Sequence, residues 1–280
     1  MKSAPNSRVN LDKAIQRFAG DVARASALRN LMANSIVAQM IGNGVVKGGS
    51  GLRFRYGEEM TRVTMDLDTA WRTGLDDFLK DLKAHLADGW HGFSGAIVLR
   101  PMASPRGVPF EYVMQPCDIK LNYLGRPWYT VQLEVGHNEI GDADGCDMVE
   151  VPDDLSALFD YLAFPRPSPI PTMRIEYQIA QKLHGVSAPS SMRAHDLIDL
   201  QLIMMHSNIN LGLVSELCRK LFKYRRSQKW PPKIIKGETW DAAYDGQRRN
   251  LPILPTVDDA ISWAQKLVDE IDLNANIHHQ

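Results

Sequence analysis

The chain has 280 residues, of which 44% are hydrophobic and 23% are charged, and its formal net charge is −1. A chain of this length buries its core without disulfide bonds, and the small net charge excludes a nucleic-acid partner held by the field of the whole protein. Three cysteines, far apart and odd in number, fit a reduced cytoplasmic protein without a zinc cluster. No run of about eighteen apolar residues is present, so we expect no membrane span.

The first half of the chain reads as helices mixed with short strands. Apolar residues at intervals of three and four predict helices at 11–41 and 75–86, and a shorter helix is expected at 50–56. Residues typical of strands, separated by turn residues, predict strands at 45–46, 64–69, 96–100, 110–114, 118–123 and 128–135. The acidic tract 142–154 lacks the ligand order of a calcium loop and reads as a solvated loop.

Alternating prolines mark a change of organisation at Phe164-Pro-Arg-Pro-Ser-Pro-Ile-Pro171. Such a run cannot continue a helix or a central strand and favours an extended spacer. We therefore expect two domains, at 1–164 and 165–280. The second reads as helical, with helices at 173–185, 192–206 and 210–224 and a last one from Thr256.

A glycine-rich turn precedes a pair of carboxylates. On a strand, Asp66 and Asp68 point the same way with Cα atoms about 6.5–7 Å apart, so they can bind one divalent cation or two, Mg²⁺ or Mn²⁺. The backbone N–H groups of Gly48, Gly49 and Ser50 can approach phosphate oxygens closely. Either motif alone is more often structural. Their order and spacing favour a nucleotide site, although neither a P-loop nor a dinucleotide-binding motif is present.

Several segments together resemble one family. Gly48-Gly-Ser50 with Leu52-Arg53, followed by Arg62-Val-Thr-Met-Asp-Leu-Asp68, is similar to the GG(S/T)xLR and RxSxDLD motifs of the AbiEii/AbiGii toxins, which are minimal nucleotidyltransferases. Further matches are Gln178-Ile-Ala-Gln-Lys-Leu-His184, Arg193-Ala-His-Asp-Leu-Ile-Asp-Leu200, and Phe222 with Arg225, Pro231-Pro232 and Trp240 to Tyr244. Thr64 stands where the family usually has serine.

The resemblance implies an α/β nucleotidyltransferase core of the polymerase-beta type with a mixed sheet, followed by a C-terminal helical bundle. It implies transfer of a nucleoside monophosphate from an NTP to an acceptor, an EC 2.7.7-type reaction. Asp66 and Asp68 would bind the metal, and Glu134 would add a third carboxylate, as the fold generally has one on a later strand. Lys182 would contact the nucleotide phosphates, and Asp196 would position or activate the acceptor.

The resemblance also implies the biology. It suggests a toxin of a toxin–antitoxin or phage-defence pair, with an antitoxin encoded nearby and the 3′ end of tRNA as the preferred acceptor, so that translation is blocked. Two alternatives stay open: modification of a protein hydroxyl or a small molecule such as an antibiotic, and a catalytically silent binding module.

Two further questions stay open at the sequence level. The first is whether Asp196 or Asp199 is the aspartate that acts in the active site. A basic stretch with aromatic neighbours, which suits an RNA backbone and unstacked bases, is also typical of a solvated helix end. Its candidate RNA-binding residues are Arg219, Lys220, Lys223, Arg225 and Arg226.

Overall fold

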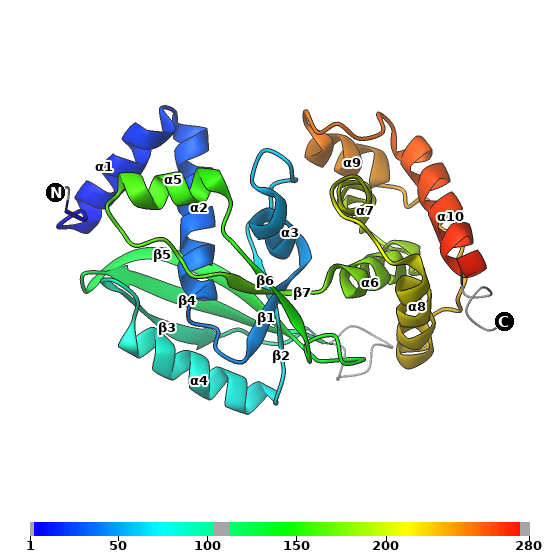
Figure 1. Ribbon diagram of the computed structural model, residues 1–280, viewed down its shortest axis with the longest axis horizontal. Coiled ribbons are helices and arrows are strands. Elements are labelled where there is room, and N and C mark those ends of the chain that lie inside the picture. The colour runs from blue at the N-terminus through cyan, green and yellow to red at the C-terminus, as the bar shows by residue number, and fades with distance from the viewer. Residues whose placement is uncertain (1–2, 104–112, 275–280) are drawn as a thin grey trace. The chain divides into compact units, whose positions relative to one another are not determined.

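The computed structural model describes residues 3–103 and 113–274, and these form two compact units (Figure 1). The first unit combines the chain up to Gly57 with Thr64–Asn138 and Cys146–Thr172. The second combines Glu58–Val63 and Glu139–Gly145 with the chain from Met173 onward. Two short segments of the first half of the chain therefore belong to the second unit.

A mixed seven-stranded sheet organises the first unit, with strand order β3-β4-β5-β2-β1-β7-β6. β1 pairs antiparallel with β2 and parallel with β7, β2 pairs parallel with β5, and β3, β4 and β5 form an antiparallel meander. The bounds are β1 Gly44–Lys47, β2 Leu67–Trp71, β3 Phe93–Leu99, β4 Gln115–Tyr123, β5 Arg126–Gly136, β6 Cys146–Val149 and β7 Ile170–Met173. The mixed α/β sheet confirms the predicted fold class.

Helices of the first unit share one apolar core with this sheet. The helices are α1 Arg8–Ala19, α2 Val22–Ala38, α3 Gly48–Tyr56, α4 Leu75–Asp88 and α5 Asp153–Tyr161. Side chains on alternate residues of β4 and β5 enter the core, including Ile119, Leu121, Val131 and Leu133. Because strand side chains alternate, the residues between them, such as Lys120 and Glu134, lie on the opposite face.

The structure corrects four sequence predictions. The helix predicted at 11–41 is broken into α1 and α2 because Gly20, at φ +85°, ends the first and the Asp21 carboxylate caps the second. The tract 142–154 is not a solvated loop, since it contains β6 and the start of α5. The proline run does not stay a spacer, because its last residues enter β7 beside β1. The strand predicted at 64–69 begins only at Leu67.

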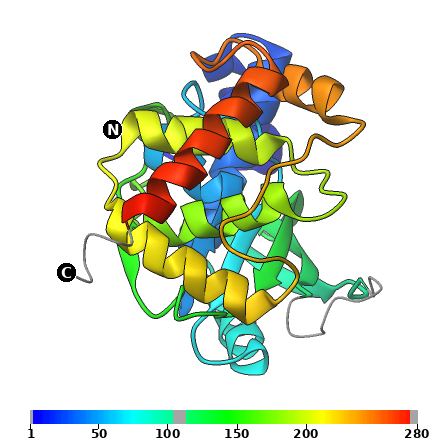
Figure 2. The same cartoon turned by 90° about the vertical axis from the view of Figure 1, so that its right-hand side faces the viewer.

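The second unit is helical, as predicted. Its helices are α6 Ile175–Ser187, α7 His195–His206, α8 Leu211–Arg225, α9 Trp240–Arg248 and α10 Val257–Asn274. Figure 2 shows α10 lying across the other helices, and it contacts α7, α8 and α9. Its buried stripe consists of Val257, Ala260, Ala264, Leu267, Val268 and Ile271, at the spacing of one helical face.

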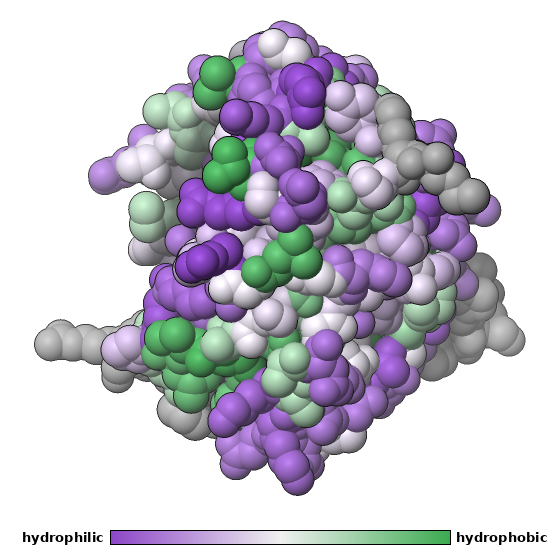
Figure 3. All heavy atoms as spheres, turned by 90° about the vertical axis from the view of Figure 1, so that its left-hand side faces the viewer, coloured by the Kyte–Doolittle hydropathy of each residue, from purple (hydrophilic) through white to green (hydrophobic). Residues whose placement is uncertain are grey.

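Apolar residues form small groups among polar ones on the face shown in Figure 3, an ordinary pattern for a protein surface. None of the described helices has the length and apolar character needed to cross a membrane. The strand predicted at 110–114 falls largely on residues outside the described ranges.

Candidate active site

The glycine-rich turn is a direct passage from β1 into α3. Lys47 ends the strand, and Gly48 begins the helix at a φ of +62°. A Cβ atom on Gly48 would overlap the carboxylate of Asp68. The glycine is therefore required twice, for its left-handed backbone and for the room it leaves to the carboxylate.

Ser50 holds the next part of the site in place. Its side chain is 2% exposed, and its hydroxyl donates a hydrogen bond to the carbonyl oxygen of Asp66. That bond places Asp66, which lies just before β2 and so is not oriented by strand alternation. The hydroxyl is engaged in this contact, so a phosphate at this helix end would meet the first-turn N–H groups of α3.

Three charged residues form one row across three neighbouring strands. Lys47 on β1 is the register partner of Asp68 on β2, and Asp68 is the register partner of Glu134 on β5. Neighbouring strands lie roughly 4.7–4.9 Å apart, and residues that are register partners point to the same face of the sheet. Asp68 and Glu134 are both partly accessible to solvent. The register brings the predicted third carboxylate beside Asp68.

The pKa of the Glu134 carboxyl is affected by the neighbouring carboxylates. Burial raises its pKa above the ordinary value, and the negative charges of Asp68 and Asp66 raise it further, whereas Arg100 and Lys47 oppose the shift. Repulsion among carboxylates of this kind is what a bound cation relieves. The three acidic side chains thus share one electrostatic environment.

These residues fit a magnesium ion as partial ligands. No group of three ligating side chains within residues 3–103 and 113–274 is arranged as a preformed metal site. Mg²⁺ usually takes one or two carboxylates from the protein and completes its shell with water and substrate phosphates. The pair Asp66 and Asp68 supplies hard oxygen ligands for such a shared site.

Two residues without a predicted role fix the segment before Asp66. The buried guanidinium of Arg53 on α3 donates to the Thr64 carbonyl at 2.8 Å and to the Asn30 amide oxygen at 3.0 Å. Asn30 on α2 in turn donates to the Met65 carbonyl at 3.0 Å. Arg53 belongs to the quoted LR motif, which was the signal available in the sequence for this role.

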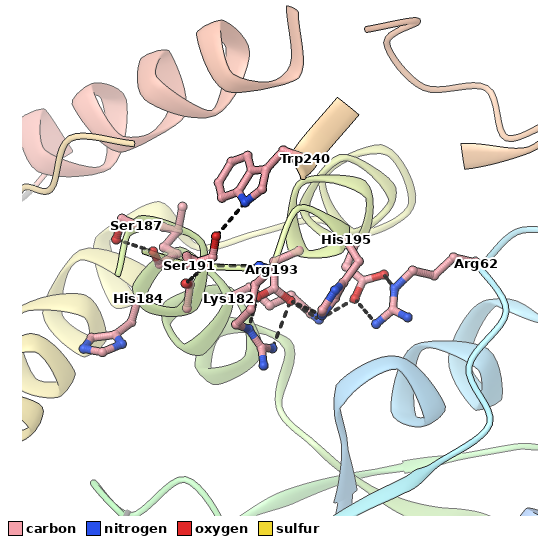
Figure 4. A network of polar contacts seen from close by, with 12 residues as sticks. Arg62, Lys182, His184, Ser187, Ser191, Arg193, His195 and Trp240 are labelled. Carbon is pink, nitrogen blue, oxygen red and sulfur yellow. Dashed lines mark hydrogen bonds and ion pairs between the residues drawn. The ribbon is translucent and has the colours of Figure 1, made fainter. Parts of the chain in front are cut away.

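In the second unit, Lys182 lies at the centre of a buried ion network (Figure 4). The side chain on α6 is only 4% exposed, and its ammonium lies 2.6 Å from Asp199 Oδ2 and 3.3 Å from Asp196 Oδ1. Arg62 binds Asp199 with two hydrogen bonds of 2.9 and 3.0 Å. Arg193 binds Asp196 in the same way, at 2.6 and 3.2 Å.

The network keeps its aspartates ionised. Burial alone would raise the pKa of the Asp199 carboxyl, but Lys182 and Arg62 outweigh burial and hold that pKa below its usual range. For Asp196, burial also acts to raise the pKa, but Arg193 and Lys182 outweigh it, so the pKa of this carboxyl is lowered as well. Both aspartates lie on α7, about one helical turn apart, and both are therefore charged partners of Lys182.

Comparison with known proteins identifies the chain. The model of a family described as "Nucleotidyl transferase AbiEii toxin, Type IV TA system" matches residues 27–266. This chain belongs to the AbiEii nucleotidyltransferase toxin family. Among curated proteins, none matches it.

A solved structure with a TM-score above 0.5 shows the same fold as this AbiEii protein. MenT4, a nucleotidyltransferase toxin of Mycobacterium tuberculosis, is 15% identical with a TM-score of 0.54, and the match covers 95% of this chain and 98% of that one. JHP933 from Helicobacter pylori is also 15% identical, with a TM-score of 0.45 and coverage of 89% and 92%. The family assignment makes the protein a nucleotidyltransferase toxin of a toxin–antitoxin system, with an NTP substrate and an antitoxin partner.

The predicted RNA-binding residues of the AbiEii chain divide into two groups. Ion pairs engage Arg219 with Asp272 at 2.5 Å, Lys220 with Glu216 at 2.7 Å, and Arg225 with Glu139 at 2.7 Å. Lys223 and Arg226 are exposed, and neither pairs with a carboxylate among the described residues. Lys229 and Lys233, which follow in the chain, share both properties.

Proposed function

We propose that this AbiEii protein transfers a nucleoside monophosphate from an NTP to the 3′ end of tRNA in the cytoplasm and so blocks translation. Asp66 and Asp68, with Glu134 beside them, would hold Mg²⁺ or Mn²⁺, and the first turn of α3 would receive the phosphates. The bound metal would neutralise charge on the triphosphate as the leaving pyrophosphate forms. Growth arrest on expression, relieved by the antitoxin, is the expected phenotype.

One observation supports this proposal above the others. The row of Asp68 and Glu134, with Asp66 fixed by Ser50, adjoins the start of a helix whose first turn is entered through Gly48. Oxygen ligands next to a helix N-terminus are what a metal-bound triphosphate requires. An intact carboxylate pair also disfavours the catalytically silent alternative.

RNA is favoured as the acceptor by a group of exposed cations. We call Lys223, Arg226, Lys229 and Lys233 the free basic segment, because among the described residues no carboxylate pairs with them. They lie within eleven residues of chain at the end of α8 and in the segment after it. Unpaired lysine and arginine side chains are what phosphate groups of RNA would contact.

The test is incubation of the purified protein with each α-labelled NTP, Mg²⁺ and total tRNA. We expect label on tRNA and none without protein. Label on the protein itself or on a small molecule would show that the acceptor is not RNA. No transfer from any of the four NTPs, with or without cellular extract, would contradict the proposed activity.

A further inference from the structure

Lys47 occupies the position from which a cation can reach a nucleotide bound at the carboxylates. It is the last residue of β1, the residue before the first turn of α3, and the register partner of Asp68. In the sequence it is only the residue in front of a glycine turn. The structure places it in the same row as two of the candidate metal ligands.

The Lys47 side chain extends from β1 past the neighbouring strand β2, so that its ammonium lies over β5. Its Nζ atom lies 2.5 Å from where a Cβ atom of residue 136 would be, and Gly136 follows Glu134 by two positions on β5. Any side chain at position 136 would displace the ammonium from this place. Gly136 and Gly48 therefore serve the same purpose, one making room for Lys47 and the other for Asp68.

Lys47 is close enough to Glu134 to act on its carboxyl electrostatically, but it is not paired with a carboxylate of the described residues. Among the described residues, its ammonium forms no ion pair or side-chain hydrogen bond, and the residue is partly exposed. Arg100, which also opposes the pKa shift of Glu134, is paired with Asp118 at 3.4 Å. Of these two cations, Lys47 has its charge available for a ligand.

Lys182 contrasts with Lys47 in each of these respects. Its side chain is 4% exposed, and its ammonium is held by two aspartates that are themselves buried. Moving it toward a phosphate would leave both carboxylates without their shared cation, which is costly in a buried site. Of the two lysines, Lys47 therefore has the more accessible and less strongly paired ammonium.

We propose that the Lys47 ammonium binds the triphosphate of the nucleotide, together with the first-turn N–H groups of α3. This inference rests on the proposed function. A lysine ammonium is a compact point charge with three donors, suited to phosphate oxygens whose positions change as pyrophosphate leaves. The competing explanation is that Lys47 only balances the charge of Asp66, Asp68 and Glu134.

The experiment compares Lys47→Met with wild type in two measurements. The dissociation constant of a non-hydrolysable NTP analogue is measured with Mg²⁺ present, and thermal unfolding is measured without nucleotide. We expect the dissociation constant to rise about 10- to 100-fold, because one charge-assisted contact is lost, and the unfolding temperature to fall little. Unchanged affinity together with a lower unfolding temperature would show that Lys47 only balances charge, and would overturn the proposal.

Gly136→Ala is the second variant, since it keeps every charge and its Cβ atom overlaps chiefly the ammonium of Lys47. It should weaken analogue binding in the same direction, whereas a charge-balancing lysine predicts no effect. Lys182→Met is the comparison variant and should lose stability more than Lys47→Met does. If wild-type protein binds none of the four NTP analogues, the proposed function fails as well as this inference. If wild-type protein binds an analogue and Lys47→Met and Gly136→Ala bind it equally well, this inference is overturned while the proposed function stands.

Discussion

Arg62 and Asp199, 137 residues apart in the sequence, form an ion pair through two hydrogen bonds of 2.9 and 3.0 Å. Arg62 precedes Asp66 by four residues and lies in the segment Glu58–Val63, which belongs to the second unit. On the other side of Val63, Arg53 and Asn30 hold the carbonyl groups of Thr64 and Met65. The chain that leads to the candidate metal ligands is therefore fixed on both sides.

Removing the charge of Asp199 should be strongly destabilising. Asp199→Asn leaves Arg62 and Lys182 without their shared carboxylate in a buried site, and we expect a loss of about 3–5 kcal/mol in the free energy of unfolding. Urea denaturation at pH 7.5 measures it. Asp160→Asn, which breaks an exposed ion pair with Arg166, is the control and should leave the midpoint almost unchanged. Equal small effects in both variants would contradict a stabilising network.

Two histidines, His184 buried and His195 partly buried, should make stability fall as the pH falls. Burial, with Arg225 and Arg193, lowers the pKa of His184 to about 3, and burial lowers that of His195 to about 4. In the unfolded chain both pKa values return to about 6.5, so below that pH the unfolded state binds more protons. Between pH 7.5 and 5, we expect each histidine to reduce the free energy of unfolding by roughly 2 kcal/mol.

Denaturation curves of His184→Gln across that pH range test the assignment. The variant should be less stable at pH 7.5, because contacts with Arg225 and Ser227 change, yet lose less stability on acidification. The titration of Asp196 and Asp199 does not affect stability in this pH range. Their lowered pKa values mean that their contribution is lost only below about pH 4. A pH dependence equal to that of wild type would rule out His184 as its source.

Gly48→Ala should abolish transfer for a reason separable from stability. The new Cβ overlaps the Asp68 carboxylate and also strains a backbone at φ +62°. Gly125→Ala carries the same kind of strain, at φ +71°, but its Cβ meets nothing within 4 Å. Both variants should lose about 1–2 kcal/mol of stability. Only Gly48→Ala should lose nucleotide transfer; retained activity there would contradict the tight fit around Asp68.

RNA affinity should depend on the free basic segment. Lys223→Gln with Arg226→Gln should weaken tRNA binding and lower the slope of log affinity against log salt by about 1.4–1.8, if each residue contacts one phosphate. Filter binding from 50 to 200 mM salt measures the slope. Lys80→Gln with Lys83→Gln on α4 removes the same charge elsewhere and is the control. Equal slopes in both double variants would place the RNA on another surface.

Local sequence patterns identified most of the elements that carry the site, although β2 begins at Leu67 and not at Thr64. The glycine turn, the Asp-Leu-Asp segment and four helices of the second unit, α6, α7, α8 and α10, were identified from spacing and turn residues, whereas α9 was not predicted. The family resemblance supplied the chemistry. Both depend on residues close together in the chain, where propensity and periodicity act.

Relationships between distant residues could not be read in this way. The row of Lys47, Asp68 and Glu134 depends on strand register, which the pairing of three strands sets together. The position of Asp66 depends on a hydrogen bond from Ser50 rather than on strand alternation. Pro171 lies in β7 because pairing beside β1 outweighed the preference of the proline run for an extended spacer.

The most direct test of the central claim is nucleotide transfer by Asp66→Asn and Asp68→Asn, measured with Mg²⁺ and each labelled NTP. Both carboxylates are partly accessible, so both variants should fold and unfold at temperatures near that of wild type. We expect a loss of about a thousandfold or more in transfer rate, because the metal would lose a charged ligand. Folded variants that transfer nucleotide at the wild-type rate would contradict a metal site at these residues.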